Sequence, residues 1–485
     1  MLLLSACSLI INPDITTGGG TDAGATDGSA VACAVHSDCD ILGSTQICGP
    51  DSVCVEALGP HCPRFVGPLG EDNTVIVGTI MPTVGDFTSI GRPIEQAEEL
   101  AITEINDSGG LPGGRRLVLL ECDSSGSREQ GLEVADHLID TVGVPVIFGP
   151  AFSSIFIDVT TQRSAPAGVM TISPSATSPT ISGLDDNGLG WRTAASDTFQ
   201  GTAIADLIRL RGFTKVIALG KDDAYGLGLL NKVGEELVTE LGEDNYFSLS
   251  FPDPGTTPNP DYASAVVNSL TALPDADVTV LLGTTEVAEV LDLFEIALTE
   301  NATVSSMRYI MADGGKASQT LDLAELDETL IPRIEGTESD HNNGQLYTAF
   351  SLRFQQRFGV PPGIYNANAY DAVYLVAYAM STLPEAQAAT GASVAAAMAR
   401  LADTSAEVVE AGPSHINEAR NALASGGNIN YEGASGPLDF DLMTGEAGAN
   451  VARWVVEKRA NGMFRFINSG AYTITGNSGS WDITP

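Results

Sequence analysis

The chain has 485 residues, a length that suggests about three structural units. Its 62 acidic residues outnumber the 23 Lys and Arg, which gives a formal net charge of -39. Such a surface repels nucleic-acid phosphates and anionic membrane surfaces, so we expect no nucleic-acid partner. Hydrophobic residues make up 43% of the chain, which is ample for a globular core. No apolar run approaches the roughly 18 residues of a membrane-spanning helix.

The start of the chain contains a candidate lipidation site. The segment Leu4-Ser5-Ala6-Cys7 matches a bacterial lipobox, after whose cleavage the cysteine becomes the lipidated N-terminus. A secretion signal carries a basic segment and about 7–15 apolar residues before this site, so we interpret residues 1–7 as a signal-peptide remnant with the true start upstream. The alternative is a chance apolar start. Residues 8–30, rich in Gly, Thr, Asp and Ala, predict a flexible tether. We therefore expect an exported, membrane-anchored lipoprotein that faces the periplasm or the cell surface.

The cysteine count indicates an oxidising compartment. If Cys7 carries lipid, an even six of the seven cysteines remain, which suits three disulfides whose pairing the sequence leaves open. No Cys-x-x-Cys spacing occurs, which argues against a zinc ribbon. We expect a small Cys-rich disulfide module over residues 31–62, because so short a segment cannot bury much and needs covalent staples. The six candidates are Cys33, Cys39, Cys48, Cys54, Cys62 and Cys122.

From about residue 72, short apolar runs alternate with amphipathic helical stretches. Near-continuous apolar runs are typical of strands buried on both faces of a parallel sheet, and this alternation predicts doubly wound α/β folding. The run is too long for one sheet, so we infer two α/β lobes, with ligand binding expected at the carboxyl ends of the strands. The predicted strands are Thr74–Met81, Arg116–Glu121, Val144–Gly149, Val169–Ser173, Lys215–Gly220, Tyr246–Phe251, Asp277–Gly283 and Tyr309–Ala312.

After residue 342 the pattern becomes helical. We predict helices over Leu346–Phe358, Ala367–Met380 and Val394–Ala402. Strands are expected to return only at Arg453–Glu457 and Met463–Ile467.

Sequence motifs for catalysis are absent. The chain has no Gly-x-x-x-x-Gly-Lys-Ser/Thr phosphate loop and no Gly-x-Ser-x-Gly nucleophile elbow. An isolated Gly226-Leu-Gly228 lacks the rest of a dinucleotide fingerprint. We therefore expect no enzyme activity, no catalytic residue, no cofactor and no metal. The five histidines, none of them spaced for a zinc-hydrolase motif, are His36, His61, His137, His341 and His415.

Several segments together resemble a known family. In their order and intervals they are similar to the leucine/isoleucine/valine-binding branch of type I periplasmic binding proteins, the substrate-binding proteins of branched-chain amino-acid ABC transporters. The resemblance covers roughly residues 72–470 and leaves out the lipobox and the Cys-rich module. The segments that carry it are Gly78–Pro82 with Gly91, Ala101–Gly110, Ile147–Ser154, Ile172–Pro179 with Trp191-Arg192-Thr193, Asp222–Gly226, Ala367–Tyr374 and Tyr431–Phe440.

The resemblance implies two α/β lobes that are joined by three crossovers and trap a ligand between them. We place these crossovers near Thr193, Thr337 and Gly445. Lobe 1 would then comprise residues 72–192 and 338–445, and lobe 2 residues 193–337 and 446–485. The late return of strands would complete the second lobe.

The resemblance also implies which residues hold the ligand carboxylate. Ser153 follows a strand and precedes a helical stretch, where hydroxyls and free N–H groups favour an anion; the alternative is a plain N-cap. Thr177 matches a second carboxylate donor, and the backbone carbonyl of Ser175 matches an acceptor for the ligand ammonium. A simple turn is the alternative for this loop.

The implied partner of the ligand ammonium is Asp313, which follows the strand Tyr309–Ala312. Family members usually carry Glu here, so the shorter side chain changes the geometry, and a solvated turn aspartate is the alternative. Tyr225 matches an aromatic residue that closes over the ligand. Ile90 and Tyr365 match residues of the side-chain pocket.

The chain departs from the family at two positions. Thr285 stands where the branched-chain binders have tyrosine, which leaves the identity of the ligand open. Phe152 replaces a cysteine that some relatives pair with one near Cys122. Cys122 must therefore pair elsewhere, with Cys62 as one candidate, or stay free.

The implied function is capture of a small polar ligand, such as an amino acid, by hinge closure and delivery to an ABC permease. The first alternative is a ligand-sensing receptor of the same fold that signals to a partner protein. The Cys-rich module, which is unusual for transport binders, keeps this alternative open. A secreted enzyme without a visible motif and a structural surface protein with a decayed cleft are further alternatives.

Overall fold

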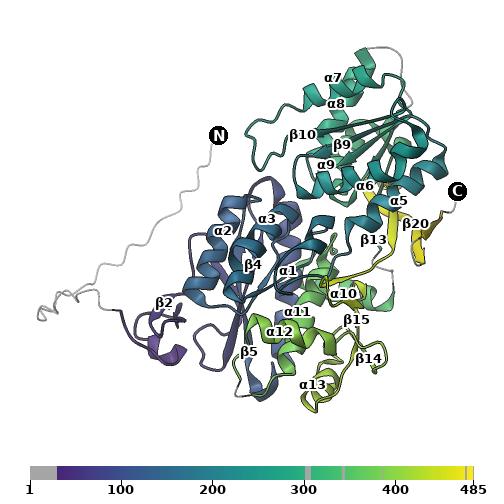
Figure 1. Cartoon of the computed structure of the whole chain (residues 1–485). Coiled ribbons are helices and arrows are strands. Elements are labelled where there is room, and N and C mark those ends of the chain that lie inside the picture. The colour runs from purple at the N-terminus through teal and green to yellow at the C-terminus, as the bar shows by residue number, and fades with distance from the viewer. Residues whose placement is uncertain (1–29, 301–306, 341–343, 386, 476–477, 484–485) are drawn as a thin grey trace, which may run out of the picture.

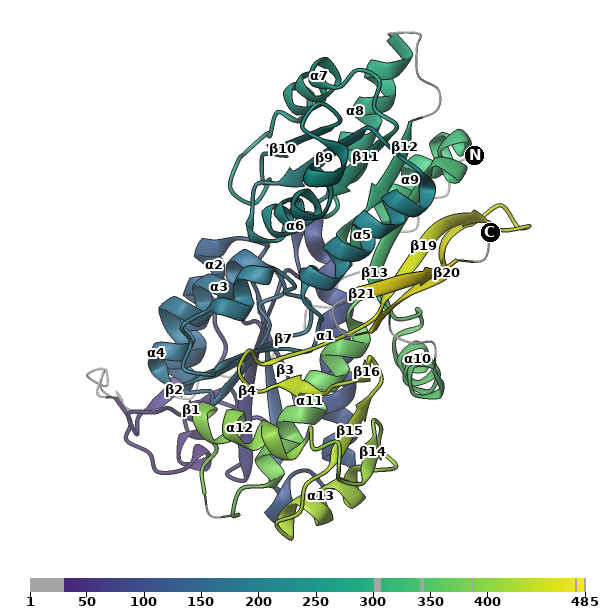
Figure 2. The same cartoon turned by 45° about the vertical axis from the view of Figure 1, so that its right-hand side comes forward.

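A computed structural model describes residues 30–300, 307–340, 344–385, 387–475 and 478–483. The predicted signal remnant, Cys7 and the tether up to residue 29 lie outside the described residues. Two lobes, each built on an eight-stranded sheet, lie one above the other in both views (Figures 1 and 2). The predicted α/β fold with two parallel-sheet lobes is therefore confirmed.

Lobe 1 is built on a sheet with the order β17-β18-β8-β7-β6-β4-β5-β3. The neighbours from β8 to β5 are parallel, whereas β3 adds an antiparallel edge next to β5. The strands are β3 (Arg64–Val66), β4 (Thr74–Met81), β5 (Arg116–Asp123), β6 (Val146–Phe148), β7 (Met170–Ser173), β8 (Gly190–Arg192), β17 (Phe440–Asp441) and β18 (Glu446–Ala447).

Alternate residues of β5 show why both faces of this sheet are covered. Leu117 and Leu119 pack into one core with α1 and α11, whereas Val118 and Leu120 pack into a second core with α2. All four are fully buried, as expected of a doubly wound sheet. The helices of lobe 1 are α1 (Thr88–Asp107), α2 (Arg128–Asp136), α3 (Ser153–Val159), α4 (Ala165–Ala167), α10 (Gln345–Phe358), α11 (Asn366–Ser381), α12 (Gly391–Ala397) and α13 (Ile416–Ala424).

Lobe 2 is built on a sheet with the order β10-β9-β11-β12-β13-β19-β20-β21. The strands from β10 to β13 are parallel, and β19 to β21 add an antiparallel ribbon, drawn in yellow in Figure 2. The strands are β9 (Val216–Lys221), β10 (Tyr246–Phe251), β11 (Val278–Leu282), β12 (Arg308–Met311), β13 (Ile334–Ser339), β19 (Val451–Lys458), β20 (Phe464–Thr475) and β21 (Ser478–Asp482). Its helices are α5 (Asp197–Arg211), α6 (Ala224–Leu241), α7 (Tyr262–Ala272), α8 (Val287–Glu300) and α9 (Ser318–Leu326).

The chain passes between the lobes three times. It leaves lobe 1 between β8 and α5, returns between β13 and α10, and crosses again between β18 and β19. Thr193 lies at the first of these crossings, Thr337 within β13 before the second, and Gly445 just before β18.

Two sequence expectations about strands are wrong. Strands occur well before Arg453. A small sheet on lobe 1 consists of β14 (Val408–Glu410), β15 (Asn430–Gly433) and β16 (Gly436–Pro437), and β17 and β18 follow. Strands of two to four residues are too short to show a period-two pattern. The run Tyr246–Phe251 is not buried on both faces either, because β10 is the edge strand and its middle residues are partly exposed.

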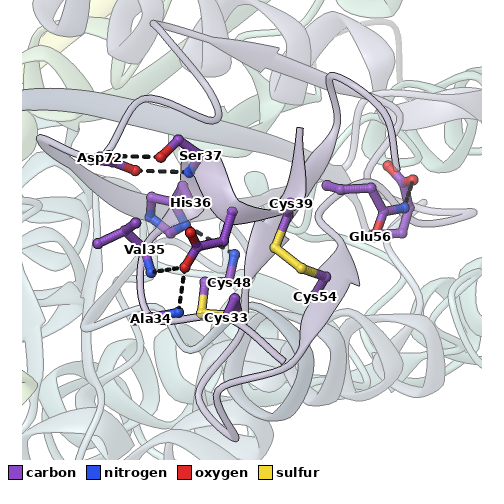
Figure 3. Close-up of a disulfide and its surroundings, with 12 residues drawn as sticks. Cys33, Ala34, Val35, His36, Ser37, Cys39, Cys48, Cys54, Glu56 and Asp72 are labelled. Atoms are coloured by element: carbon purple, nitrogen blue, oxygen red, sulfur yellow. Dashed lines mark hydrogen bonds between the residues drawn. A yellow bond between two sulfur atoms is a disulfide. The ribbon is translucent and has the colours of Figure 1, made fainter. Parts of the chain in front are cut away.

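The Cys-rich module is stapled internally and fixed to lobe 1. Disulfides join Cys33 to Cys48 and Cys39 to Cys54 around the hairpin of β1 (Gln46–Cys48) and β2 (Cys54–Glu56) (Figure 3). The third disulfide joins Cys62 to Cys122 of β5. This settles the pairing that the sequence left open and attaches the module to lobe 1.

Candidate ligand-binding site

A cavity of about 50 Å³ lies between the lobes at the carboxyl ends of their parallel strands. This edge is where open α/β sheets place their ligands. Residues on the lobe 1 side are Ile90, Ala151, Phe152, Ser153, Ser175, Ile364 and Tyr365. Residues on the lobe 2 side are Lys221, Asp223, Tyr225, Thr284, Asp313, Gly314, Lys316 and Ala317.

The lobe 1 wall presents neutral hydrogen-bonding groups. Ser153 is the first residue of α3, after β6, and its Oγ accepts a hydrogen bond from the N–H of Ser178 at 3.2 Å. Ser175 follows β7, and its hydroxyl donates to the carbonyl of Ala151 at 2.9 Å. These bonds fix two hydroxyl groups beside the cavity before any ligand arrives.

Asp313 accepts hydrogen bonds from both lobes. It follows β12 and is 3% exposed. The hydroxyl of Tyr225, from lobe 2, donates to Asp313 Oδ1 at 2.7 Å, and that of Tyr365, from lobe 1, donates to Oδ2 at 2.5 Å. Tyr365 adopts a φ of 63°, a strained value for a residue with a side chain, and sits at the start of α11. The fold thus holds a tyrosine in an unfavourable conformation beside a buried carboxylate.

A second buried acid lies behind this site. Asp197 starts α5, and its Oδ2 accepts a hydrogen bond from the hydroxyl of Thr177 at 2.9 Å. Asp197 Oδ1 accepts no hydrogen bond from any described residue. Burial, and then the nearby charge of Asp313, raises the pKa of Asp197 well above its usual range. Burial also raises the pKa of Asp313, although hydrogen bonds from Tyr365 and Tyr225 oppose the shift. This end of the site therefore has two buried carboxyl groups close together. When they ionise, their negative charge is uncompensated, and a cationic ligand group would offset it.

Lys221 and Asp223 form a buried ion pair at the end of β9. Lys221 Nζ lies 2.9 Å from Asp223 Oδ2, and the two side chains are 3% and 6% exposed. The other carboxylate oxygen of Asp223 accepts the backbone N–H of Gly226 and so caps α6. Pairing explains how two full charges remain buried in the cavity wall.

Hydrogen bonds link the lobes around the cavity. The backbone of Ala224, at the start of α6, donates its N–H to Ser154 Oγ at 3.0 Å and accepts from the Ser178 hydroxyl at 2.7 Å. Together with the bond from Tyr365 to Asp313, these contacts join the two lobes beside the cavity.

A wider groove of about 1070 Å³ opens between the lobes outside this cavity. Phe87 lines the groove and Phe152 lines the cavity, and their rings meet edge to face with centroids 5.0 Å apart. Thr285 lines the groove, whereas its neighbour Thr284 lines the cavity. The aromatic pair therefore stands between the inner cavity and the outer groove.

The structure gathers six of the eight sequence-predicted ligand residues around one cavity. Thr177 does not line the cavity, and its hydroxyl donates to Asp197. Thr285 lines the outer groove. The six are Ile90, Ser153, Ser175, Tyr225, Asp313 and Tyr365.

Sequence reasoning missed the ion pair, Lys316 and Asp197. The sequence pattern that could have revealed Lys221 is a lysine at the end of a buried apolar strand. Within the described residues, the one group of candidate ligand atoms close enough to share a metal ion belongs to Cys33, Cys39 and Cys54. These cysteines are bound in disulfides, so they offer no thiolate to a metal.

Two α/β lobes with three crossings and a cavity between them define a ligand-binding protein of the type I periplasmic binding fold. Residues 94–445 match the family model described as the receptor family ligand binding region. This match spans most of the chain, and the chain belongs to that family. The resemblance stated from the sequence is confirmed.

Curated relatives match over part of their length. Leu/Ile/Val-binding protein homolog 3 of Brucella melitensis biotype 1 is 29% identical over 181 residues, which cover 35% of this chain and 47% of that protein. Leu/Ile/Val-binding protein BraC3 of Rhizobium johnstonii is 31% identical over 177 residues, with the same shares. The chain thus spans about half the length of these relatives. Glutamate receptor 3.1 of Oryza sativa subsp. japonica is 28% identical over 304 residues, 60% of this chain and 31% of that protein.

Solved structures share the fold at lower identity. The branched-chain amino acid substrate-binding protein LivJ of Streptococcus pneumoniae, in complex with isoleucine, has a TM-score of 0.60 at 18% identity and covers 81% of this chain and 99% of its own. A solute-binding protein of Rhodopseudomonas palustris, in complex with 3,4-dihydroxybenzoic acid, has a TM-score of 0.63 at 20% identity and covers 82% and 97%. These neighbours are substrate-binding proteins of ABC transporters. No helix in the described part of the chain is both long enough and apolar enough to span a bilayer.

Proposed function

We propose that this protein is an extracytoplasmic solute-binding lipoprotein that captures an α-amino acid between its lobes and delivers it to an ABC transporter. The observation that carries the proposal is the Asp313 carboxylate, buried between the lobes and reached by hydroxyls from both. A buried carboxylate close to a second acid, Asp197, suits a ligand ammonium. The hydroxyl of Ser153 on the opposite wall accepts the N–H of Ser178 and keeps its own proton to donate to a ligand carboxylate.

A ligand screen by calorimetry tests the proposal. The disulfide-intact protein is titrated with the common L-amino acids and with 4-hydroxybenzoate, because structural neighbours include complexes with benzoates. We expect at least one α-amino acid to bind with one site per chain, and 4-hydroxybenzoate not to bind. Binding of the benzoate but of no amino acid would contradict the proposal.

The lipid anchor is the second part of the proposal. We expect the exported protein to begin at an acylated Cys7, because the lipobox precedes a polar stretch. Mass spectrometry of protein expressed with an intact upstream signal measures this modification directly. An exported protein with an unmodified Cys7 would rule out the anchor.

A ligand-sensing receptor is the second candidate function. It is favoured by the Cys-rich module, which Cys62–Cys122 fixes to lobe 1 and which lies away from lobe 2 in both views (Figures 1 and 2). A rigidly attached module can report the state of its lobe to a partner. Uptake of the ligand in a deletion strain separates the two candidates: lost uptake supports delivery, and intact uptake supports sensing.

A further inference from the structure

Lys221 stands out among the charged residues of the cavity because it is almost completely enclosed. It is the last residue of β9 and is 2% exposed. Its side chain lines the cavity together with Thr284 and Phe152. A lysine so enclosed must satisfy its charge with protein or ligand groups.

The described residues satisfy the ammonium group of Lys221 only in part. An ammonium carries three N–H donors. Asp223 Oδ2 accepts one at 2.9 Å. Thr284 Oγ1 lies at 3.5 Å, the limit of a hydrogen bond, and the Phe152 ring centroid lies at 5.4 Å. One short acceptor for three donors leaves room for an acceptor supplied by a ligand.

Lys221 keeps its charge in this position. Burial alone lowers the pKa of Lys221, but the charges of Asp223, Glu286 and Asp253 outweigh it and raise the pKa above its ordinary value. The second oxygen of Asp223 accepts the N–H of Gly226, and Glu286 accepts the N–H and hydroxyl of Thr284.

The sheet sets the separation between Lys221 and Asp313. β9 and β12 are separated by one strand, β11, so their ends lie about 10 Å apart at roughly 4.8 Å per strand. This is the distance between the backbones of the two strand ends, and the side chains of Lys221 and Asp313 both line the cavity between the lobes. A ligand in this cavity that carries an amine and a second carboxylate can therefore present the amine to Asp313 and the carboxylate to Lys221.

We propose that Lys221 binds a terminal carboxylate at the far end of the ligand, so that the protein selects an acidic α-amino acid. This inference rests on the proposed function, because Asp313 must hold the ammonium of the same ligand. The competing role for Lys221 is purely structural: it would only hold Asp223 at the start of α6.

Calorimetry with L-glutamate, L-aspartate, L-leucine and glutarate separates these roles. We expect one of the two acidic amino acids to bind at least 10-fold more tightly than L-leucine. Lys221→Met should weaken binding of that acidic ligand by about 10- to 150-fold, which is the usual loss of affinity for a charge-assisted hydrogen bond. The affinity for L-leucine should change less than about 3-fold. Lys215→Met is the matched control, because it removes the same charge just before β9, where Lys215 pairs with Asp275.

A double variant guards against misfolding. Lys221→Met leaves Asp223 buried without its partner, so Lys221→Met/Asp223→Asn removes both charges and should show the same selective loss. L-leucine binding more tightly than both acids, or an equal loss for all ligands in the double variant, would overturn the inference and leave the proposed function standing. Binding of glutarate with no amino acid bound would overturn both.

Discussion

The two walls of the cavity differ in chemistry. Lobe 1 contributes mainly neutral groups, such as the hydroxyl of Ser153 and the apolar side chain of Phe152, whereas lobe 2 contributes Lys221, Asp223 and Asp313. Neutral hydrogen-bond donors can be buried within one lobe at a small cost in desolvation free energy, but buried charges need charged partners. The difference suggests that lobe 2 selects the ligand by charge and that lobe 1 supplies the platform on which it lies.

The largest expected effect is the loss of the charge on Asp313. Asp313→Ala should weaken amino-acid binding by at least about 10- to 150-fold, because it removes a charge-assisted hydrogen bond and leaves a buried ammonium unpaired. Calorimetry measures the change, and Asp275→Asn, an exposed acid of the same lobe, is the control. If Asp313→Ala binds the ligand as tightly as the parent, the charge assignment of lobe 2 is wrong.

The second-largest expected effect is a pH dependence of ligand affinity, which originates at the neighbouring carboxyl groups of Asp313 and Asp197. The pKa values of Asp313 and Asp197 are raised in the empty protein, so at low pH both carboxyls are protonated. As pH rises above the ordinary carboxyl range, the buried groups ionise at a cost in stability, and a ligand ammonium offsets that cost. Affinity should therefore rise with pH through the raised pKa values, by at most about 10-fold per unit for one released proton.

Calorimetry from pH 5 to pH 8, in two buffers of different ionisation enthalpy, measures both the affinity and the released proton. Asp197→Asn should flatten the dependence, because it removes one of the two carboxyl groups whose pKa is raised. An affinity that increases as pH falls would have the opposite sign and would contradict this assignment.

The smallest expected effect is on the neutral wall. Ser153→Ala removes one neutral hydrogen bond, worth about 0.5–1.5 kcal/mol, so affinity should fall by about 2- to 12-fold. Ser425→Ala, at the exposed end of α13, is the control. A loss for Ser153→Ala equal to that for Asp313→Ala would erase the proposed difference between the walls.

The parts of the fold that the sequence predicted are those with simple apolar patterns. The strand Thr74–Met81 has the predicted bounds because all its residues are apolar, small or β-branched. The strand β13 escaped prediction because it contains Glu335 and Glu338, which are buried through ion pairs with Arg211, Arg453 and Lys316. A buried strand that carries paired charges does not look like a buried strand in the sequence.

Some features of the candidate site could likewise be predicted from the sequence, and others could not. Asp313 and Ser153 could be proposed because the family resemblance places them in the site and because each follows a strand at the edge where ligands bind. The meeting of Asp313 with Tyr365 could not be derived from local sequence alone, since the two are 52 residues apart and come from different lobes. The hydrogen bond from Thr177 to Asp197 likewise depends on tertiary packing and could not be derived from local sequence.

Small-angle X-ray scattering tests the central claim, that a ligand held by both walls closes the lobes. The radius of gyration is measured for the parent protein and for Asp313→Ala, each with and without a saturating amino acid found by the calorimetric screen. We expect a smaller radius of gyration for the bound parent protein and a reduced change for the variant at the same ligand concentration. An unchanged radius in the parent, with binding confirmed in the same sample, would contradict capture by closure.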